Sequence, residues 1–111
     1  MSYLRTTRAK TPVIYKPEET FPIGGCKVHK FTGDKHEAVI IAAGITLHEA
    51  LKAQKVLFEE GVDAVVVDLY SVKPIDKDTL LKVTEGVKKI VVVEDHYEEG
   101  GIAEAEICNW K

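Results

Sequence analysis

Three short runs rich in valine and isoleucine recur along the chain, at residues 38–43, 64–67 and 90–93. The first run is continuously apolar over six residues. Such a run is typical of a strand buried on both faces of a parallel sheet. We therefore predict a β-strand at each of the three runs.

The segments between these runs carry the start and stop signals of helices. Thr46 is placed as an N-cap, and Glu49 follows at the spacing of a capping box. Apolar residues at helical spacing then lead to a predicted stop at Gly61. Asp76 can cap a second helix, which should end before Gly86. The pattern therefore predicts two helices, one between each pair of successive strands.

Strands that alternate with helices are typical of a parallel sheet with right-handed crossovers. A further strand is predicted at residues 27–31, where polarity alternates. Its short spacing to the run at 38–43 permits only an antiparallel hairpin between the two. We predict a three-layer α/β domain whose sheet is mostly parallel, with one antiparallel edge strand.

Little of the sequence is left to cover the predicted sheet. A third helix is expected to open at Gly100-Gly101 and to begin at Ile102, but it carries polar Glu104 and Glu106. Gln54 is the one polar break on the apolar face of the first helix. A sheet that is covered on only part of its faces leaves apolar area exposed. We therefore expect a truncated domain that another segment or chain completes.

The first 23 residues differ from the rest because they hold three of the four prolines. Proline restricts its own backbone and that of its neighbour. We interpret residues 12–15 as an extended piece followed by a linker, with a turn at Gly24-Gly25. The predicted division is therefore 1–23 and 24–111.

Composition excludes several classes of function. The chain has 111 residues, 45% of them hydrophobic, and a formal net charge of −3. This balance gives no electrostatic reason to expect nucleic acid or an anionic membrane as a partner. No apolar stretch approaches the roughly 20 residues that span a bilayer. Cys26 and Cys108 form no metal-binding spacing, and we expect both to be reduced thiols of a cytoplasmic protein.

The most suggestive polar cluster is Glu94-Asp95-His96, directly after the third run. Ligands of open α/β sheets bind at the carboxyl ends of the strands, and this cluster could provide acid–base or ligand chemistry there. The simpler interpretation is a strand end that caps the next helix or contacts a neighbouring subunit.

Two further features are weaker candidates. The turn at Gly44 leads into a helix and could hold a phosphate, although it matches no known phosphate loop. Arg5, Arg8 and Lys10 could contact an anion. His29 and His36 have no obvious partner ligands, so no metal site is assigned. The residues by themselves do not define a reaction.

Longer strings of sequence resemble the C-terminal domain of transketolases. Residues 43–51, 67–76 and 93–102 are similar to its successive strand ends and following turns, in the family's order. Residues 4–15 resemble the last strand of the preceding pyrimidine-binding domain. The resemblance covers residues 4 to about 105, departs at Ala103, where the family usually has glycine, and is lost after Ala105. It also extends, more weakly, to β subunits of 2-oxoacid dehydrogenases and to deoxyxylulose phosphate synthase.

The resemblance implies a parent enzyme that transfers ketol units between sugar phosphates, using thiamine diphosphate with Mg²⁺ or Ca²⁺. In such enzymes the cofactor lies at the interface of a homodimer, in domains that this chain lacks. We therefore expect no cofactor bound here, an inert isolated chain, and the remaining transketolase domains as its partners. Arg8 corresponds to the family's sugar-phosphate arginine.

Two alternatives to a transketolase fragment stay open at this point. One is a standalone docking subunit, or binding module, of a split thiamine-dependent enzyme. The other is a small α/β ligand-binding domain that uses Gly44, Thr46 and the edge formed by Glu94, Asp95 and His96.

Overall fold

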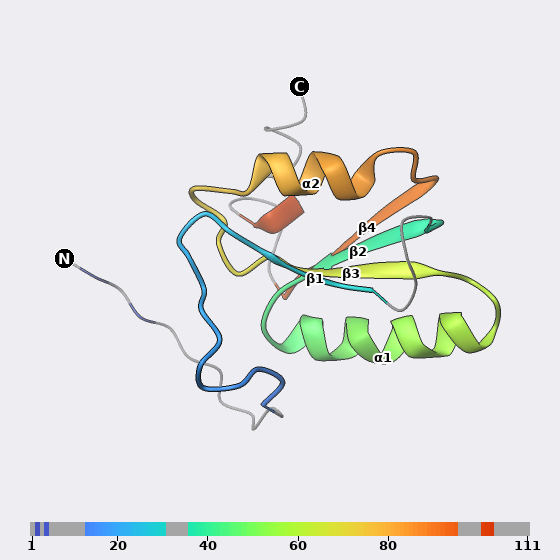
Figure 1. The fold of residues 1–111 in the computed structure, drawn as a ribbon, viewed down its shortest axis with the longest axis horizontal. Helices are drawn as coiled ribbons and strands as arrows, with labels where there is room; N and C mark the ends of the chain where they lie inside the picture. Colours follow the sequence, from blue (N-terminus) through green and yellow to red (C-terminus); the bar gives the residue numbers. More distant parts are fainter. Residues whose placement is uncertain (1, 3, 5–12, 31–35, 96–100, 104–111) are drawn as a thin grey trace.

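A computed structural model describes residues 2, 4, 13–30, 36–95 and 101–103 (Figure 1). Four strands and two helices form in the described part of the chain. In chain order they are β1 (Lys27–His29), β2 (Ala38–Ala42), α1 (Ile45–Glu59), β3 (Ala64–Asp68), α2 (Lys77–Thr84) and β4 (Lys89–Val93).

The four strands form one mixed sheet in the order β1-β3-β2-β4. β2 lies between β3 and β4 and runs parallel to both, with Val39 opposite Val65 on one side and Ile90 on the other. β1 pairs antiparallel with β3 at one edge of the sheet. The predicted fold class, a mostly parallel α/β sheet with one antiparallel edge strand, is confirmed.

The predicted hairpin between the first two strands is wrong, because β3 lies between β1 and β2. The short connection excluded a parallel pairing of these strands, but it did not require them to be neighbours. All five residues of β3 are buried, whereas those of β1 are only half-buried. The apolar strand therefore takes the inner position, and the strand with alternating polarity takes the edge.

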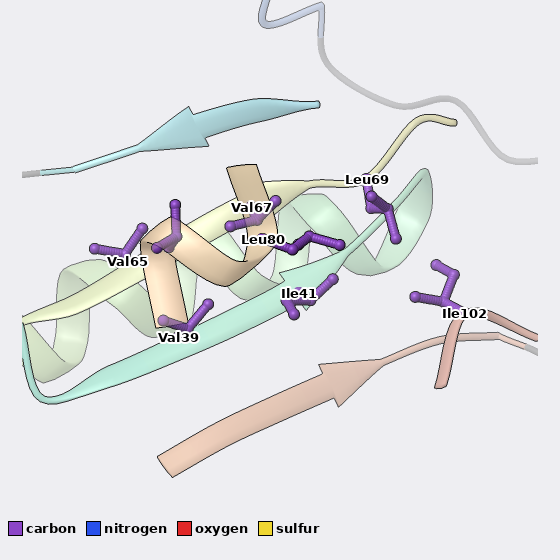
Figure 2. Packing of buried hydrophobic residues seen from close by; sticks show 8 residues of the cluster. Val39, Ile41, Val65, Val67, Leu69, Leu80 and Ile102 are labelled. Atoms are coloured by element: carbon purple, nitrogen blue, oxygen red, sulfur yellow. The ribbon is translucent and has the colours of Figure 1, made fainter. Parts of the chain in front are cut away.

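The two helices cover opposite faces of the sheet, which gives three layers (Figure 1). Side chains of β2 alternate between the faces, as the pleat of a strand requires. Val39 and Ile41 join the core on the α2 side, where Leu80 packs (Figure 2). Ile40 and Ala42 join the core on the α1 side, where the helix contributes Leu47 and Ala50.

The predicted start of α1 is wrong by two residues. The helix begins at Ile45 with Gly44 at the N-cap, and no side chain caps it. The Thr46 hydroxyl instead lies 2.8 Å from the carbonyl oxygen of Ala43 and 2.9 Å from that of Val93. Gly44 has a φ of 65°, a conformation that glycine adopts without strain, so the chain turns sharply into the helix there.

The other predicted helix boundaries are confirmed. The Asp76 carboxylate accepts a hydrogen bond from the backbone N–H of Thr79 at 3.1 Å, as an N-cap should. Gly61 and Gly86 follow the two helices with positive φ values. The third helix begins as predicted at Ile102, and its continuation beyond residue 103 lies outside the described residues.

The described part of the N-terminal segment, residues 13–26, contains no strand. We call residues 13–24 the arm. It runs beside the sheet before the chain enters β1 (Figure 1). No helix among the described residues has the length and apolar character needed to cross a membrane.

Candidate functional site at the carboxyl edge of the sheet

The parallel strands β2, β3 and β4 end at one common edge. From β2 the chain passes through α1 to β3 on one side, and from β3 it passes through α2 to β4 on the other side. The carboxyl ends of β2 and β4 therefore flank the switch point of the sheet, where ligands of open α/β folds bind. The turn at Gly44 and the cluster at Glu94 both lie at these strand ends.

At this switch point a polar side chain forms hydrogen bonds with the backbone of the same chain. The Glu94 carboxylate accepts hydrogen bonds from the N–H groups of Ile102 and Ala103, at 2.9 and 3.0 Å. A side-chain carbon on Gly101 would overlap the same carboxylate, so a larger residue there would displace the carboxylate from these N–H groups. Glu94 thus caps the start of the following helix, which is the simpler of the two interpretations of the sequence.

Among the other residues predicted for the strand-edge cluster or for substrate contact, the structure describes only Asp95. Asp95 is exposed and has no described bonding partner in the cluster. His96 and Arg8 both lie outside the described residues. The acid–base site predicted at residues 94–96 therefore gains no support from the described part of the cluster.

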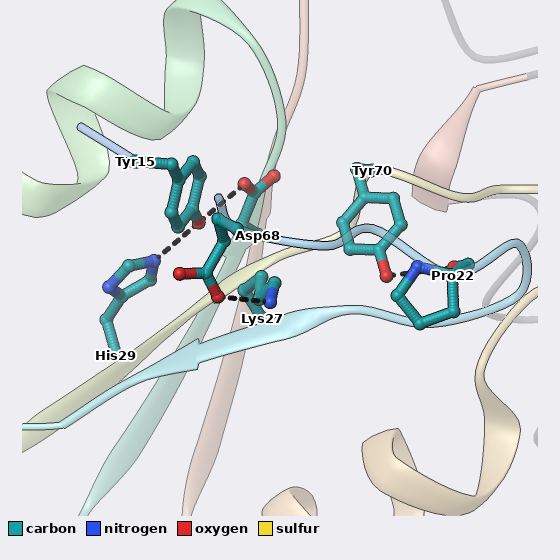
Figure 3. Close-up of polar contacts among 7 residues, drawn as sticks. Tyr15, Pro22, Lys27, His29, Asp68 and Tyr70 are labelled. Carbon is teal, nitrogen blue, oxygen red and sulfur yellow. Dashed lines mark hydrogen bonds and ion pairs between the residues drawn. The ribbon is translucent and has the colours of Figure 1, made fainter. Parts of the chain in front are cut away.

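A second polar cluster, which the sequence analysis missed, lies at the end of β3 (Figure 3). The Tyr15 hydroxyl donates to Oδ2 of Asp68 at 2.8 Å. Its oxygen also lies 2.8 Å from Nε2 of His29, and it accepts from this nitrogen when Nε2 carries the proton. Asp68 is only 5% exposed, so the tyrosine supplies a hydrogen bond that a buried carboxylate requires.

The environment keeps the Tyr15 hydroxyl protonated. Burial raises the pKa of Tyr15 well above its ordinary value, and the hydrogen bond to Asp68 and the charge of that carboxylate raise it further. A tyrosine in this state is a donor at neutral pH and is unsuited to abstract a proton. The Tyr15, His29 and Asp68 side chains therefore hold the arm against β1 and β3.

Aromatic contacts continue this attachment along the arm. The Phe21 ring packs edge-on against Tyr15, at 5.0 Å between centroids, and against Tyr70 at 5.1 Å. The Tyr70 hydroxyl donates to the Pro22 carbonyl oxygen at 2.9 Å (Figure 3). Lys27 forms an ion pair with Glu19 and lies 5.1 Å from the centre of the Phe21 ring. The arm is thus joined to the domain by several independent contacts.

An open cleft of about 490 Å³ lies between the arm and the start of α1. Its lining is mixed, with apolar Leu47 and Phe21 beside polar Lys16 and His48. Among the residues that the structure describes, no group of three or more histidine, cysteine or acidic side chains could hold a metal ion. The described residues at this edge therefore form a cleft and a network of hydrogen bonds. They do not form a recognisable set of catalytic side chains.

Only part of this network could have been found from sequence. Asp68 and Gln54 are polar residues in apolar surroundings, which is a signal for buried hydrogen bonding. Tyr15, in a proline-rich segment 53 residues before Asp68, carried no comparable signal.

Comparison with known proteins gives a consistent result. The family described as "Transketolase, C-terminal domain" matches residues 9–110. Transketolase-like protein 1 of Bos taurus is 48% identical over 95% of this chain and 18% of its own length. Transketolase of Rattus norvegicus is 41% identical over 93% of this chain and 16% of its own length. This chain thus spans less than a fifth of these relatives.

A solved structure agrees with the sequence comparisons. It is named "Split gene transketolase, inactive beta4 tetramer", and it superposes with a TM-score of 0.82 at 34% identity. The match covers 92% of this chain and 33% of the solved chain.

Proposed function

Because this chain belongs to the transketolase C-terminal domain family, we propose that it is the structural C-terminal part of a thiamine-diphosphate-dependent transketolase. The observation that carries the proposal is the family match at residues 9–110, on a domain whose strand-end groups bond to each other. In this role the chain is a structural domain of the enzyme and has no catalytic activity by itself.

The reaction of the parent enzyme is ketol transfer between sugar phosphates, with Mg²⁺ or Ca²⁺ holding the diphosphate. The described residues of this chain do not fit that cofactor, because they contain no cluster of metal-ligating side chains. We infer that the cofactor is bound by other domains of the parent, a cytoplasmic homodimer. The role of this chain is then to position those domains.

The partner in this proposal is the remainder of a transketolase, in the same chain or in a separate one. The solved neighbour supports a separate chain as a workable arrangement, since its name describes a split-gene enzyme and an inactive assembly of one subunit type. The arm offers a natural connection, because it is attached to the domain through Tyr15 and Tyr70.

Arg8 is the one residue that we propose for substrate contact, through the phosphate of the sugar. A guanidinium group binds a phosphate with two parallel hydrogen bonds, so its loss weakens phosphorylated substrates selectively. In a complete enzyme, Arg8→Ala should raise the KM for sugar phosphates with little change in kcat. An unchanged KM would contradict this role.

An assay of the isolated chain tests the proposal directly. It is assayed for ketol transfer with a ketose phosphate donor, an aldose phosphate acceptor, thiamine diphosphate and Mg²⁺. Its melting temperature is measured with and without each component. We expect no turnover and no shift with thiamine diphosphate. Turnover by the chain alone, or saturable stabilisation by the cofactor, would contradict a purely structural part.

A further inference from the structure

The protons of the Tyr15 cluster have to be shared among three side chains. The Tyr15 hydroxyl oxygen lies 2.8 Å from Oδ2 of Asp68 and 2.8 Å from Nε2 of His29 (Figure 3). A hydroxyl group carries a single proton, so it cannot donate to both neighbours at the same time. One of the two neighbours must therefore supply a proton of its own.

Only one arrangement of the protons satisfies all three groups. A carboxylate only accepts hydrogen bonds, and Asp68 is buried, so the proton of Tyr15 is directed to Oδ2. An imidazole with its proton on Nδ1 would present a lone pair at Nε2 and would compete with the carboxylate for the same tyrosine proton. One acceptor would then be left unsatisfied, which is costly in a buried site. His29 must therefore donate from Nε2.

The contacts that hold the arm fall into two groups. At its base, beside β1, the N–H of Gly24 donates to the Ser71 hydroxyl at 3.0 Å, and the Tyr70 hydroxyl donates to a carbonyl oxygen of the arm at 2.9 Å. At the other end, which we call the tip, Tyr15 reaches across to β1 and β3 through its hydroxyl. The tip is therefore held by side chains other than those that hold the base.

From this geometry we propose that His29, Tyr15 and Asp68 form a latch that holds the tip of the arm. The latch is a chain of hydrogen bonds with one direction, from Nε2 of His29 to the Tyr15 hydroxyl and from that hydroxyl to Asp68. His29 is its positioning residue, because its proton directs the tyrosine proton to the carboxylate. The arm forms one wall of the cleft beside α1, so the closed latch also fixes the shape of that cleft.

The latch goes beyond the proposed function, because it belongs to this chain and requires no catalytic partner. NMR spectroscopy of the imidazole nitrogens tests its proton arrangement in the unmodified chain, above about pH 8, where an ordinary histidine is neutral. We expect the His29 proton on Nε2. Tyr15→Phe removes the acceptor of that proton, so the fraction on Nδ1 should increase in this variant. A proton on Nδ1 in the unmodified chain would overturn the proposal.

Substitutions of His29 separate the donor from the ring. His29→Gln keeps an N–H group near the position of Nε2, whereas His29→Phe keeps only a ring that can contact Tyr15. The readout is the rate at which a glutamyl endopeptidase cleaves the folded chain after Glu18 or Glu19, which are exposed residues of the arm. His29→Phe should accelerate this cleavage about tenfold, the effect of losing one hydrogen bond. His29→Gln should leave the rate nearly unchanged.

Two cleavage results would contradict the latch. Rapid cleavage of His29→Gln together with slow cleavage of His29→Phe would show that ring packing holds the tip and that the proton does not. Equal rates in the unmodified chain and in both variants would show that other contacts, such as those of Phe21 and Tyr70, are sufficient to hold the arm. The NMR measurement uses the unmodified chain, so it decides the proton arrangement even when a variant does not fold.

Discussion

The Tyr15 hydroxyl and the Asp68 carboxylate lie 2.8 Å apart, although 53 positions separate these residues in the chain. The contact joins the arm to the carboxyl end of β3, and His29 of β1 completes it from the other side. Because Asp68 is buried, its carboxylate needs a hydrogen-bond donor from the protein, and Tyr15 supplies one. The arm therefore contributes to the stability of the domain.

Removing the Tyr15 hydroxyl should destabilise the domain. Tyr15→Phe keeps the ring contact with Phe21 but leaves the buried Asp68 without this hydrogen bond. We expect a loss of about 1–3 kcal/mol in the free energy of unfolding, measured by urea denaturation. Tyr70→Phe is the control, because the Tyr70 hydroxyl bonds to a carbonyl oxygen in an exposed setting and should cost less. Equal losses in the two variants would contradict a special role for Asp68.

The same hydroxyl should make stability depend on pH in the alkaline range. Burial and the Asp68 bond raise the pKa of Tyr15 in the folded state above the value of about 10 for an unfolded chain. The stabilisation is therefore complete below about pH 10 and is lost as the pH rises beyond it, because only the unfolded state ionises readily. Stability measured from about pH 8 to 11 should fall more steeply in the unmodified chain than in Tyr15→Phe. Parallel curves would contradict the raised pKa.

Gln54 should be essential to the packing of α1 on the sheet. Its side-chain nitrogen donates to the carbonyl oxygens of His29 and Ala64, at 2.8 and 2.9 Å, and the residue is 3% exposed. Gln54→Leu preserves the approximate size but leaves both oxygens without this donor. We expect a loss of about 1–3 kcal/mol in thermal or chemical unfolding. Lys55→Ala, at an exposed position on the same helix, should change stability little, and a comparable loss there would contradict this explanation.

Gly101 and Glu94 should contribute to stability through the same interaction. A side chain at Gly101 would displace the Glu94 carboxylate from the N–H groups that it caps. Gly101→Ala and Glu94→Ala should each destabilise the domain by about 1 kcal/mol or more. The double variant should cost much less than the sum of the two, because the second change removes nothing further. Additive losses in this double-mutant cycle would show that the two residues act separately.

The elements of this fold were largely predictable because their signals are local. The apolar runs of β2, β3 and β4 and the Asp76 cap each lie within a few residues of sequence. The order of the strands could not be predicted from local sequence. β3 lies between β1 and β2, although it begins 35 residues after the end of β1. Spacing restricts the direction of a connection, but burial decides which strand lies inside.

The site was predicted less well than the fold for a related reason. The residues at 94–96 were conspicuous as a sequence cluster, yet Glu94 bonds to Ile102 and Ala103, whose positions depend on the next turn. The Tyr15 and Asp68 pair depends on how the arm lies on the sheet, and no periodic pattern encodes that position. Resemblance to the transketolase family identified the domain more readily than any single residue did.

The central claim is that this chain is an interchangeable structural part of a transketolase. The most direct measurement replaces the matching segment of rat transketolase, to which the chain is 41% identical, with residues 9–110 and assays ketol transfer. We predict a folded chimera that retains activity with sugar phosphates and thiamine diphosphate, and loses stability when Tyr15→Phe is introduced. A folded, dimeric chimera that binds thiamine diphosphate but has no activity would contradict the claim.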